Sequence, residues 1–127
     1  MPVMLTPNEI SIARKIKSLP GFVYRTGLVF IDLSAGHQKR IVLTDPVWVR
    51  HVQTRHDIVP DVSDSFLVGM LQNMLGWPEI KTYQVEADKV AVMVDHPDNV
   101  VKNRNPVIAR AIGLYQLALE RNNLLPF

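Results

Sequence analysis

The chain has 127 residues, of which 47% are hydrophobic and 20% charged, a composition typical of one compact domain that excludes wholesale disorder. It contains no cysteine, which excludes disulfides, thiolate metal sites and thiol nucleophiles. The net charge of +2 hides an asymmetry, because residues 1–55 carry eight lysines and arginines against three acids, whereas residues 56–127 carry six against nine. Such a split is compatible with a polyanion-binding half, with self-association, or with ordinary charge scatter.

A helix is predicted close to the N-terminus. Thr6 and Glu9 have the spacing of a capping box, with Pro7 at the first helical position. Apolar residues then recur at helical spacing until Pro20-Gly21 ends the pattern. We therefore expect a helix from Pro7 to about Leu19.

The segment after this helix predicts strands and one short helix. Residues 22–33 are rich in aromatic and β-branched side chains, which favours a strand or a short hairpin interrupted at Thr26-Gly27. Residues 40–44 have the character of a returning strand. Asp45-Pro46 repeats the cap-and-proline signature and predicts a short helix to about Thr54, although β-branched residues in this stretch oppose helix formation.

A third helix is predicted after a loop over residues 57–62. Apolar residues from Phe66 to Leu75 form one helical stripe, and Ser63 is the expected N-cap. Gly76 is the expected stop, and a proline follows two residues later.

The remaining sequence predicts a β-hairpin and a final helix. Apolar and polar residues alternate through residues 80–94, with Glu86–Lys89 as the expected connection. Residues 95–99 form a polar loop. Asn105-Pro106 then opens a helix with an apolar stripe that continues to Leu119.

These elements follow the order α-β-β-α-α-β-β-α, which predicts the α+β class. We expect a single domain over residues 1–127, with a four-stranded, mainly antiparallel sheet and helices packed on its faces. The two halves do not match at a fixed period, so no internal sequence repeat is predicted.

One part of the chain is similar to a known family. The similar features are Asp61-Val-Ser-Asp64 leading into an apolar helix, two short strands, and a final helix over residues 105–119 that contains Ala109-Arg110-Ala111. In these features residues 61–122 resemble the small phage and prophage proteins grouped as the phage ABA sandwich family. The resemblance covers about half of the chain. It implies an α-β-α layered fold and a virus-encoded origin, and it brings no active site.

The densest polar cluster predicts an anion site. Its candidate anion-binding residues are Arg50, His51, Arg55 and His56. On a helix, Arg50 would neighbour Gln53 and His51 would neighbour Arg55, which presents two guanidinium groups and an imidazole to one side. Guanidinium groups are well shaped for phosphate or carboxylate. The alternative is a solvated helix end, since cations are favoured near a helix C-terminus.

Motifs for catalysis or cofactor binding are missing. The sequence contains no Gly-x-Ser-x-Gly elbow, no Walker lysine loop and no Gly-x-Gly-x-x-Gly after a strand, so we expect no enzyme and no cofactor. His51 and His56 are five residues apart and do not stack on one helical face as metal ligands would. The Asp95–Asp98 segment carries oxygen and nitrogen ligands, but turn chemistry explains it equally well. One functional alternative is a small metal-dependent nuclease around His96 and Asp98.

Two functional hypotheses remain from these patterns. The first is a phage- or prophage-encoded accessory protein that binds a host protein or a small anionic ligand without catalysis, as a possible homo-oligomer. The second is a nucleic-acid-binding module of the basic N-terminal half, in which cations are interleaved with aromatic residues: Lys15, Lys17, Phe22, Tyr24, Arg25, Phe30, Lys39 and Arg40. Against stacking, those aromatic residues sit in strand patterns and are more often core.

The ends of the chain complete the predictions. The N-terminus has no secretory signal pattern, and the longest apolar runs are far below the roughly 20 residues that cross a bilayer. A cytoplasmic protein with no membrane partner is therefore expected. The apolar segment Leu124–Phe127 either folds back onto the core or inserts into a second copy.

Overall fold

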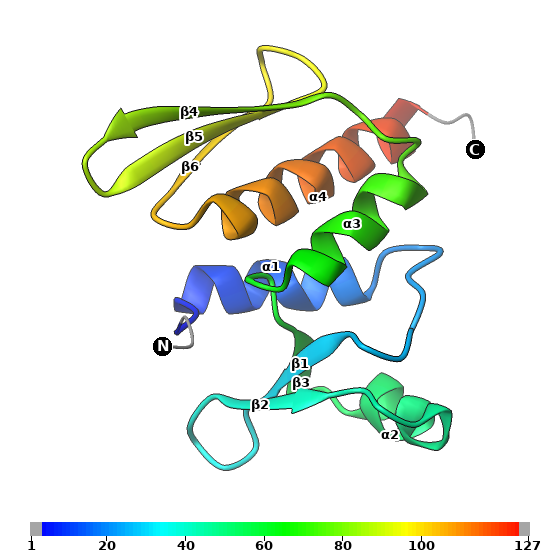
Figure 1. The fold of residues 1–127 in the computed structure, drawn as a ribbon. Helices are drawn as coiled ribbons and strands as arrows, with labels where there is room; N and C mark the ends of the chain where they lie inside the picture. The colour runs from blue at the N-terminus through cyan, green and yellow to red at the C-terminus, as the bar shows by residue number, and fades with distance from the viewer. Residues whose placement is uncertain (1–3, 125–127) are drawn as a thin grey trace. The chain divides into compact units, whose positions relative to one another are not determined.

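The computed structural model describes residues 4–124, without the side chains of residues 122–124, and Figure 1 shows its helices and strands. The chain divides into two compact units, Met1–Leu67 and Val68–Phe127. No helix among the described residues is both long and apolar enough to cross a membrane. The prediction for the Leu124–Phe127 tail concerns side chains outside the described part.

The first unit opens with helix α1, Pro7–Lys17, whose predicted capping box is confirmed. The Thr6 hydroxyl accepts a hydrogen bond from the Glu9 amide at 3.2 Å, and the Glu9 carboxylate accepts one from the Thr6 amide at 2.9 Å. Each bond satisfies a backbone donor that the first helical turn leaves without a partner. The helix ends at Lys17, two residues earlier than predicted, and the hydroxyl of the C-cap residue Ser18 donates to the Arg14 and Lys15 carbonyls.

A three-stranded antiparallel sheet follows, with the order β2-β1-β3. Its strands are β1, Val29–Asp32, β2, Lys39–Val42, and β3, Ile58–Pro60. The returning strand is confirmed, but β3 lies where a loop was predicted. All three residues of β3 are buried, so its short sequence shows no alternation of apolar and polar residues that would mark a strand.

The predicted short helix is confirmed as a 3₁₀ turn, η1, Pro46–Trp48, continued by helix α2, Val49–Thr54. The Asp45 carboxylate accepts a hydrogen bond from the Val47 amide at 3.0 Å and caps the turn. The core of this unit consists of buried side chains from α1, the sheet and α2, which include Ala13, Ile16, Leu28, Phe30, Ile31, Leu43, Val52, Ile58, Val59 and Val62.

Helix α3, Ser65–Met74, begins at the end of the first unit and continues into the second. Its N-cap is Asp64 rather than the predicted Ser63, because the Asp64 carboxylate accepts a hydrogen bond from the Phe66 amide at 3.0 Å. The Ser63 hydroxyl instead donates to Asp61 at 2.6 Å. Gly76 stops the helix as predicted, with φ at 75°, a conformation that glycine adopts without strain.

The second unit contains another three-stranded antiparallel sheet, in the order β4-β5-β6. The predicted hairpin is confirmed as β4, Ile80–Glu86, and β5, Lys89–Val94, and an unpredicted strand follows, β6, Val100–Asn103. Helix α4, Pro106–Leu124, packs against β5 and β6 (Figure 1). The Asn105 side chain accepts hydrogen bonds from the Val107 and Ile108 amides and caps this helix.

The α+β class is confirmed, whereas the single four-stranded sheet and the predicted order of elements are wrong. The two missed strands, β3 and β6, each pair in their own unit, so two three-stranded sheets form in place of one sheet of four strands. Both are short edge strands. Strand β3 owes its extended form to pairing with β1, a distant segment that local patterns do not record, whereas β6 pairs with the preceding strand β5 across the loop of residues 95–99. The single domain stays a prediction.

Candidate anion-binding site

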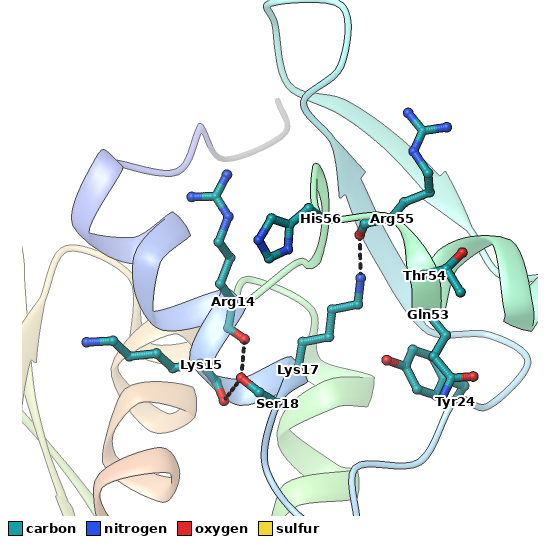
Figure 2. Close-up of a pocket in the computed structure, with 9 residues that line it drawn as sticks. All are labelled: Arg14, Lys15, Lys17, Ser18, Tyr24, Gln53, Thr54, Arg55 and His56. Atoms are coloured by element: carbon teal, nitrogen blue, oxygen red, sulfur yellow. Dashed lines mark hydrogen bonds between the residues drawn. The ribbon is translucent and has the colours of Figure 1, made fainter.

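A hollow of about 340 Å³ lies in the first unit and is lined mainly by basic side chains (Figure 2). We call it the basic hollow. Its lining comes from the C-terminal half of α1, from Tyr24 and from the segment where α2 ends: Arg14, Lys15, Lys17, Ser18, Tyr24, Gln53, Thr54, Arg55 and His56. Four of these nine residues are lysine or arginine, and none is aspartate or glutamate.

The pattern of α1 explains why its cations reach the hollow. Ala13 and Ile16 are fully buried and fix which face of the helix meets the core. Arg14 and Lys15 are consequently exposed, and Lys17 is half-buried. The helix C-terminus favours all three cations electrostatically, so their presence alone does not prove a binding site.

Lys17 has a structural role in this site. Its ammonium donates hydrogen bonds to the backbone carbonyls of Val52, Arg55 and Ile58, each at 2.7 Å. It thereby joins the end of α1 to the end of α2 and to strand β3, and the Arg55 carbonyl also accepts a hydrogen bond from the Ile58 amide at 3.4 Å. Burial lowers the pKa of Lys17 below its ordinary value, and the charge of Asp57 opposes this shift.

The charge of Arg55 is already matched within the protein. Its guanidinium donates to both carboxylate oxygens of Asp57, at 3.1 and 3.0 Å, and this pairing raises the pKa of Arg55 and lowers that of Asp57. In Figure 2 the Arg55 guanidinium points away from the Lys17 ammonium, whereas the Arg55 carbonyl faces it. Arg55 therefore shapes the rim through its backbone more than it offers a cation to a ligand.

Arg14 and His56 are the side chains best placed to meet a ligand. Figure 2 shows the Arg14 guanidinium and the His56 ring extending into the same region of the hollow, while the Lys15 side chain extends to one side. Among residues 4–124, neither the Arg14 guanidinium nor the His56 ring has a hydrogen-bonding or ionic partner. Both groups can therefore donate to an incoming anion without breaking an existing bond.

Tyr24 provides the aromatic part of the lining. Its ring stacks on Phe30 with centroids 6.1 Å apart and meets Phe22 edge-on at 5.1 Å. Partial burial raises the pKa of the Tyr24 hydroxyl, so the group remains a neutral hydrogen-bond donor at physiological pH. The cluster holds Tyr24 in a fixed place beside the basic side chains.

The structure brings together only part of the predicted anion cluster. Arg55 and His56 line the basic hollow, whereas His51 lines a different hollow and Arg50 lines neither. Arg55 has extended backbone angles, φ −91° and ψ 119°, so the helix ends before it and helical spacing does not relate it to His51. The assignment of these four residues to an anion site stays a prediction.

Sequence reasoning assigned Lys15, Lys17 and Tyr24 to a nucleic-acid face and not to the anion site, and it missed Arg14. Three cations in the last turn of a capped helix were visible in the sequence, but their meeting with the end of α2 depends on tertiary packing. The proposed nucleic-acid face also changes, because Arg40 pairs with Asp61 at 2.7 Å and Phe30 is fully buried.

The loop over residues 95–99 is built for structure in the second unit. The His96 ring lies 2.8 Å from the Glu120 carboxylate, and the Asn99 side chain donates to the Val94 and Gly113 carbonyls at 3.1 and 3.0 Å. The hydrogen bond between the His96 ring and the Glu120 carboxylate raises the pKa of His96. Within residues 4–124, no three histidine or acidic side chains are grouped so as to hold a metal ion.

Comparisons with protein-family models, with curated proteins and with solved structures find no match. The resemblance of residues 61–122 to the phage ABA sandwich family therefore stays a prediction, and the assignment of function rests on the site itself.

Proposed function

We propose that this chain is a non-catalytic binding protein for a small anionic ligand that carries a phosphate or a comparable oxyanion. The supporting observation is the basic hollow, whose lining contains four lysine or arginine residues and no carboxylate. Its volume of about 340 Å³ falls at the lower end of the roughly 300–1,000 Å³ common for small-ligand pockets.

The side chains divide into two functional groups. Arg14 and His56 donate directly to the anion, with Lys15 at one side, because an arginine fork matches two oxygens of a phosphate. Lys17 contributes positive potential while its hydrogen bonds remain on the backbone. Arg55 contributes little net charge, because Asp57 is paired with it.

Titration with inorganic phosphate and with pyrophosphate, followed by calorimetry, tests this function. Arg14→Gln should weaken binding about tenfold or more, because a hydrogen bond to a charged group is worth roughly 1.5–3 kcal/mol. The matched control is Arg50→Gln, the same chemical change at an exposed position that does not line the hollow.

Equal affinities for the wild type and Arg14→Gln would refute the basic hollow as the site. Loss of binding in Arg50→Gln alone would instead support the cluster predicted from the sequence. The free energy of unfolding is measured for both variants, so that a loss of binding is compared between equally folded proteins.

The second candidate is binding of single-stranded nucleic acid at the same hollow. The observation that favours it is Tyr24, an aromatic ring held beside exposed cations, which is the combination that stacks bases and contacts phosphates. Binding of DNA or RNA oligonucleotides that falls steeply with salt and is weakened by Arg14→Gln would support this candidate. No binding at low salt would reject it and leave the small anion.

The biological setting proposed for this binding is a phage- or prophage-encoded accessory protein that acts in the cytoplasm. The resemblance of residues 61–122 supports the origin, and the lack of cysteine is compatible with a reducing compartment. A host protein as partner and a homo-oligomeric state belong to the same proposal. Solution mass measurements with and without phosphate test the oligomer, which is rejected if the mass stays that of one chain.

A further inference from the structure

A second hollow, of about 270 Å³, lies in the first unit between one face of the sheet and the η1–α2 segment. We call it the apolar hollow. Its walls are mostly apolar side chains: Phe30, Ile41, Val42, Leu43, Trp48 and Val52. The polar groups that reach it from side chains are few, namely Asp32, Thr44 and His51.

Strand register places three of the lining side chains, those of Phe30, Asp32 and Ile41, on one face of the sheet. Phe30 pairs with Ile41, and Asp32 lies two residues beyond Phe30 on β1. Because alternate residues of a strand point to the same face, Phe30, Asp32 and Ile41 share a face. The short helix α2 lies over this face and contributes Val52, which is buried, and His51.

Trp48 stands at the opening of the apolar hollow. It is 55% exposed, and its ring meets the His51 ring edge-on with centroids 5.9 Å apart. The neighbouring Val42 and Val47 are also exposed, by 53% and 73%. A group of large exposed apolar residues around a hollow is a feature of binding sites, because covering their apolar surface with a ligand removes it from water and is favourable.

The apolar hollow has the opposite electrostatic character to the basic hollow of the same unit. Among the described residues that line it there is no lysine or arginine, and Asp32 is the acidic one. The Asp32 carboxylate accepts a hydrogen bond from the Ser34 amide at 2.9 Å, and contacts with Ser34 lower the pKa of Asp32.

Two cations act on Asp32 from outside the hollow, namely Arg55 and Lys39. Arg55 is already paired with Asp57 through two hydrogen bonds, so its charge is largely matched. Lys39 is the cross-strand partner of Asp32 and shares its face of the sheet, but it is exposed on the edge strand β2, where water screens its charge, and it does not line the hollow. Asp32 therefore keeps capacity for a cationic group that enters from the hollow.

We infer that the apolar hollow binds a small organic cation with an aromatic body and a primary ammonium group. The aromatic body fills the space between the sheet and α2, where it contacts the six apolar side chains that line the hollow and is removed from water. The ammonium group then meets the Asp32 carboxylate, and the Trp48 ring offers a second, cation–π contact. Anions are disfavoured, because the lining provides them with no lysine or arginine.

Trp48 itself reports occupancy. The chain has two tryptophans, so a Trp77→Phe background leaves Trp48 as the single fluorophore. Three probes of similar size differ in charge: phenethylammonium chloride, neutral phenethyl alcohol and sodium hydrocinnamate. Saturation-transfer NMR on the same probes runs in parallel and detects binding in Trp48→Ala, which has no fluorescence signal.

The expected result is saturable binding of phenethylammonium with a dissociation constant on the order of 1 mM or tighter. Phenethyl alcohol should bind more weakly, and hydrocinnamate more weakly still, by about tenfold relative to the cation. Asp32→Asn retains a side-chain oxygen for the Ser34 amide and should abolish the preference for the cation. Trp48→Ala should weaken all three probes.

Three outcomes would overturn the inference: no saturable binding of phenethylammonium up to about 20 mM, twenty times the expected constant; equal or tighter binding of hydrocinnamate; or an unchanged order of affinities in Asp32→Asn. Arg14→Gln serves as a control for the basic hollow and should leave phenethylammonium binding unaltered. Because the two hollows are tested with ligands of opposite charge, failure of one proposal does not imply failure of the other.

Discussion

Replacing Lys17 with methionine removes an ammonium group and leaves most of the apolar stem in place. The ammonium donates to three backbone carbonyls at 2.7 Å, those of Val52, Arg55 and Ile58. The acceptors lie 35 to 41 residues after Lys17 in the sequence, so these bonds join α1 to α2 and β3. Lys17→Met therefore tests how much the Lys17 ammonium stabilises the packing of α1 against α2 and β3 beside the basic hollow.

The expected loss follows from the burial of the acceptors. Val52 and Ile58 are 3% and 0% exposed, so water reaches their carbonyls poorly, whereas Arg55 is half-buried and its carbonyl can be hydrated. An unsatisfied buried acceptor costs about 1–3 kcal/mol. The variant also avoids burying an ammonium, which offsets part of this loss. We expect Lys17→Met to lower the free energy of unfolding by about 2–4 kcal/mol.

Urea denaturation followed through Trp48 fluorescence, in the Trp77→Phe background, measures this change within the first unit. Lys15→Met is the matched control, because Lys15 is exposed and should change stability by less than about 0.5 kcal/mol. The reasoning is refuted if Lys17→Met and Lys15→Met have the same midpoint and the same slope.

Three further predictions concern the second unit. Gly113→Ala should destabilise it by about 1–3 kcal/mol, since a Cβ there would lie 2.5 Å from Val94 Cγ2. The control is Gly69→Ala, whose Cβ would meet no atom within 4 Å and which should stabilise the unit by up to about 1 kcal/mol. A Gly113→Ala variant that is more stable than the wild type in thermal unfolding would contradict the close packing. Asn99→Ala should cost about 1–3 kcal/mol, because its buried side chain donates to two carbonyls, and an exposed change such as Asn73→Ala provides the comparison. The pKa of His96 is raised in the folded state by Glu120, so the pair stabilises the fold below the unfolded value of about 6.5, and this contribution is lost as pH rises through the folded pKa. The melting temperature of the wild type should therefore exceed that of His96→Gln more at pH 6 than at pH 9, and a constant difference across this range would argue against the linkage.

The basic hollow shows how far sequence reasoning reaches into a binding site. Arg55 and His56 belong to the polar cluster that predicted anion binding, and both line the hollow. Their partners from α1 could not be assigned from the sequence, because about 40 residues separate them along the chain. The position of Arg55 outside the helix also could not be assigned, since it depends on the pairing of β3 with β1.

The sequence by itself determined the features that depend on near neighbours. The capping box at Thr6, the Asp45 cap, the Gly76 stop and the Asn105 cap each form between residues a few positions apart, so their chemistry is visible in a short window. The same holds for the hairpin of β4 and β5, whose two strands are joined by a two-residue turn.

Only the tertiary structure decided how the distant segments combine. Strand β3 is extended because β1, a distant segment of the chain, supplies its hydrogen bonds, and no local pattern specifies that partner. Likewise, Lys17 and Arg14 are similar cations three residues apart in sequence, yet packing gives one three backbone acceptors and leaves the other facing a hollow. Residue type fixes the charge of a side chain, whereas its role is fixed by which distant groups the fold places around it.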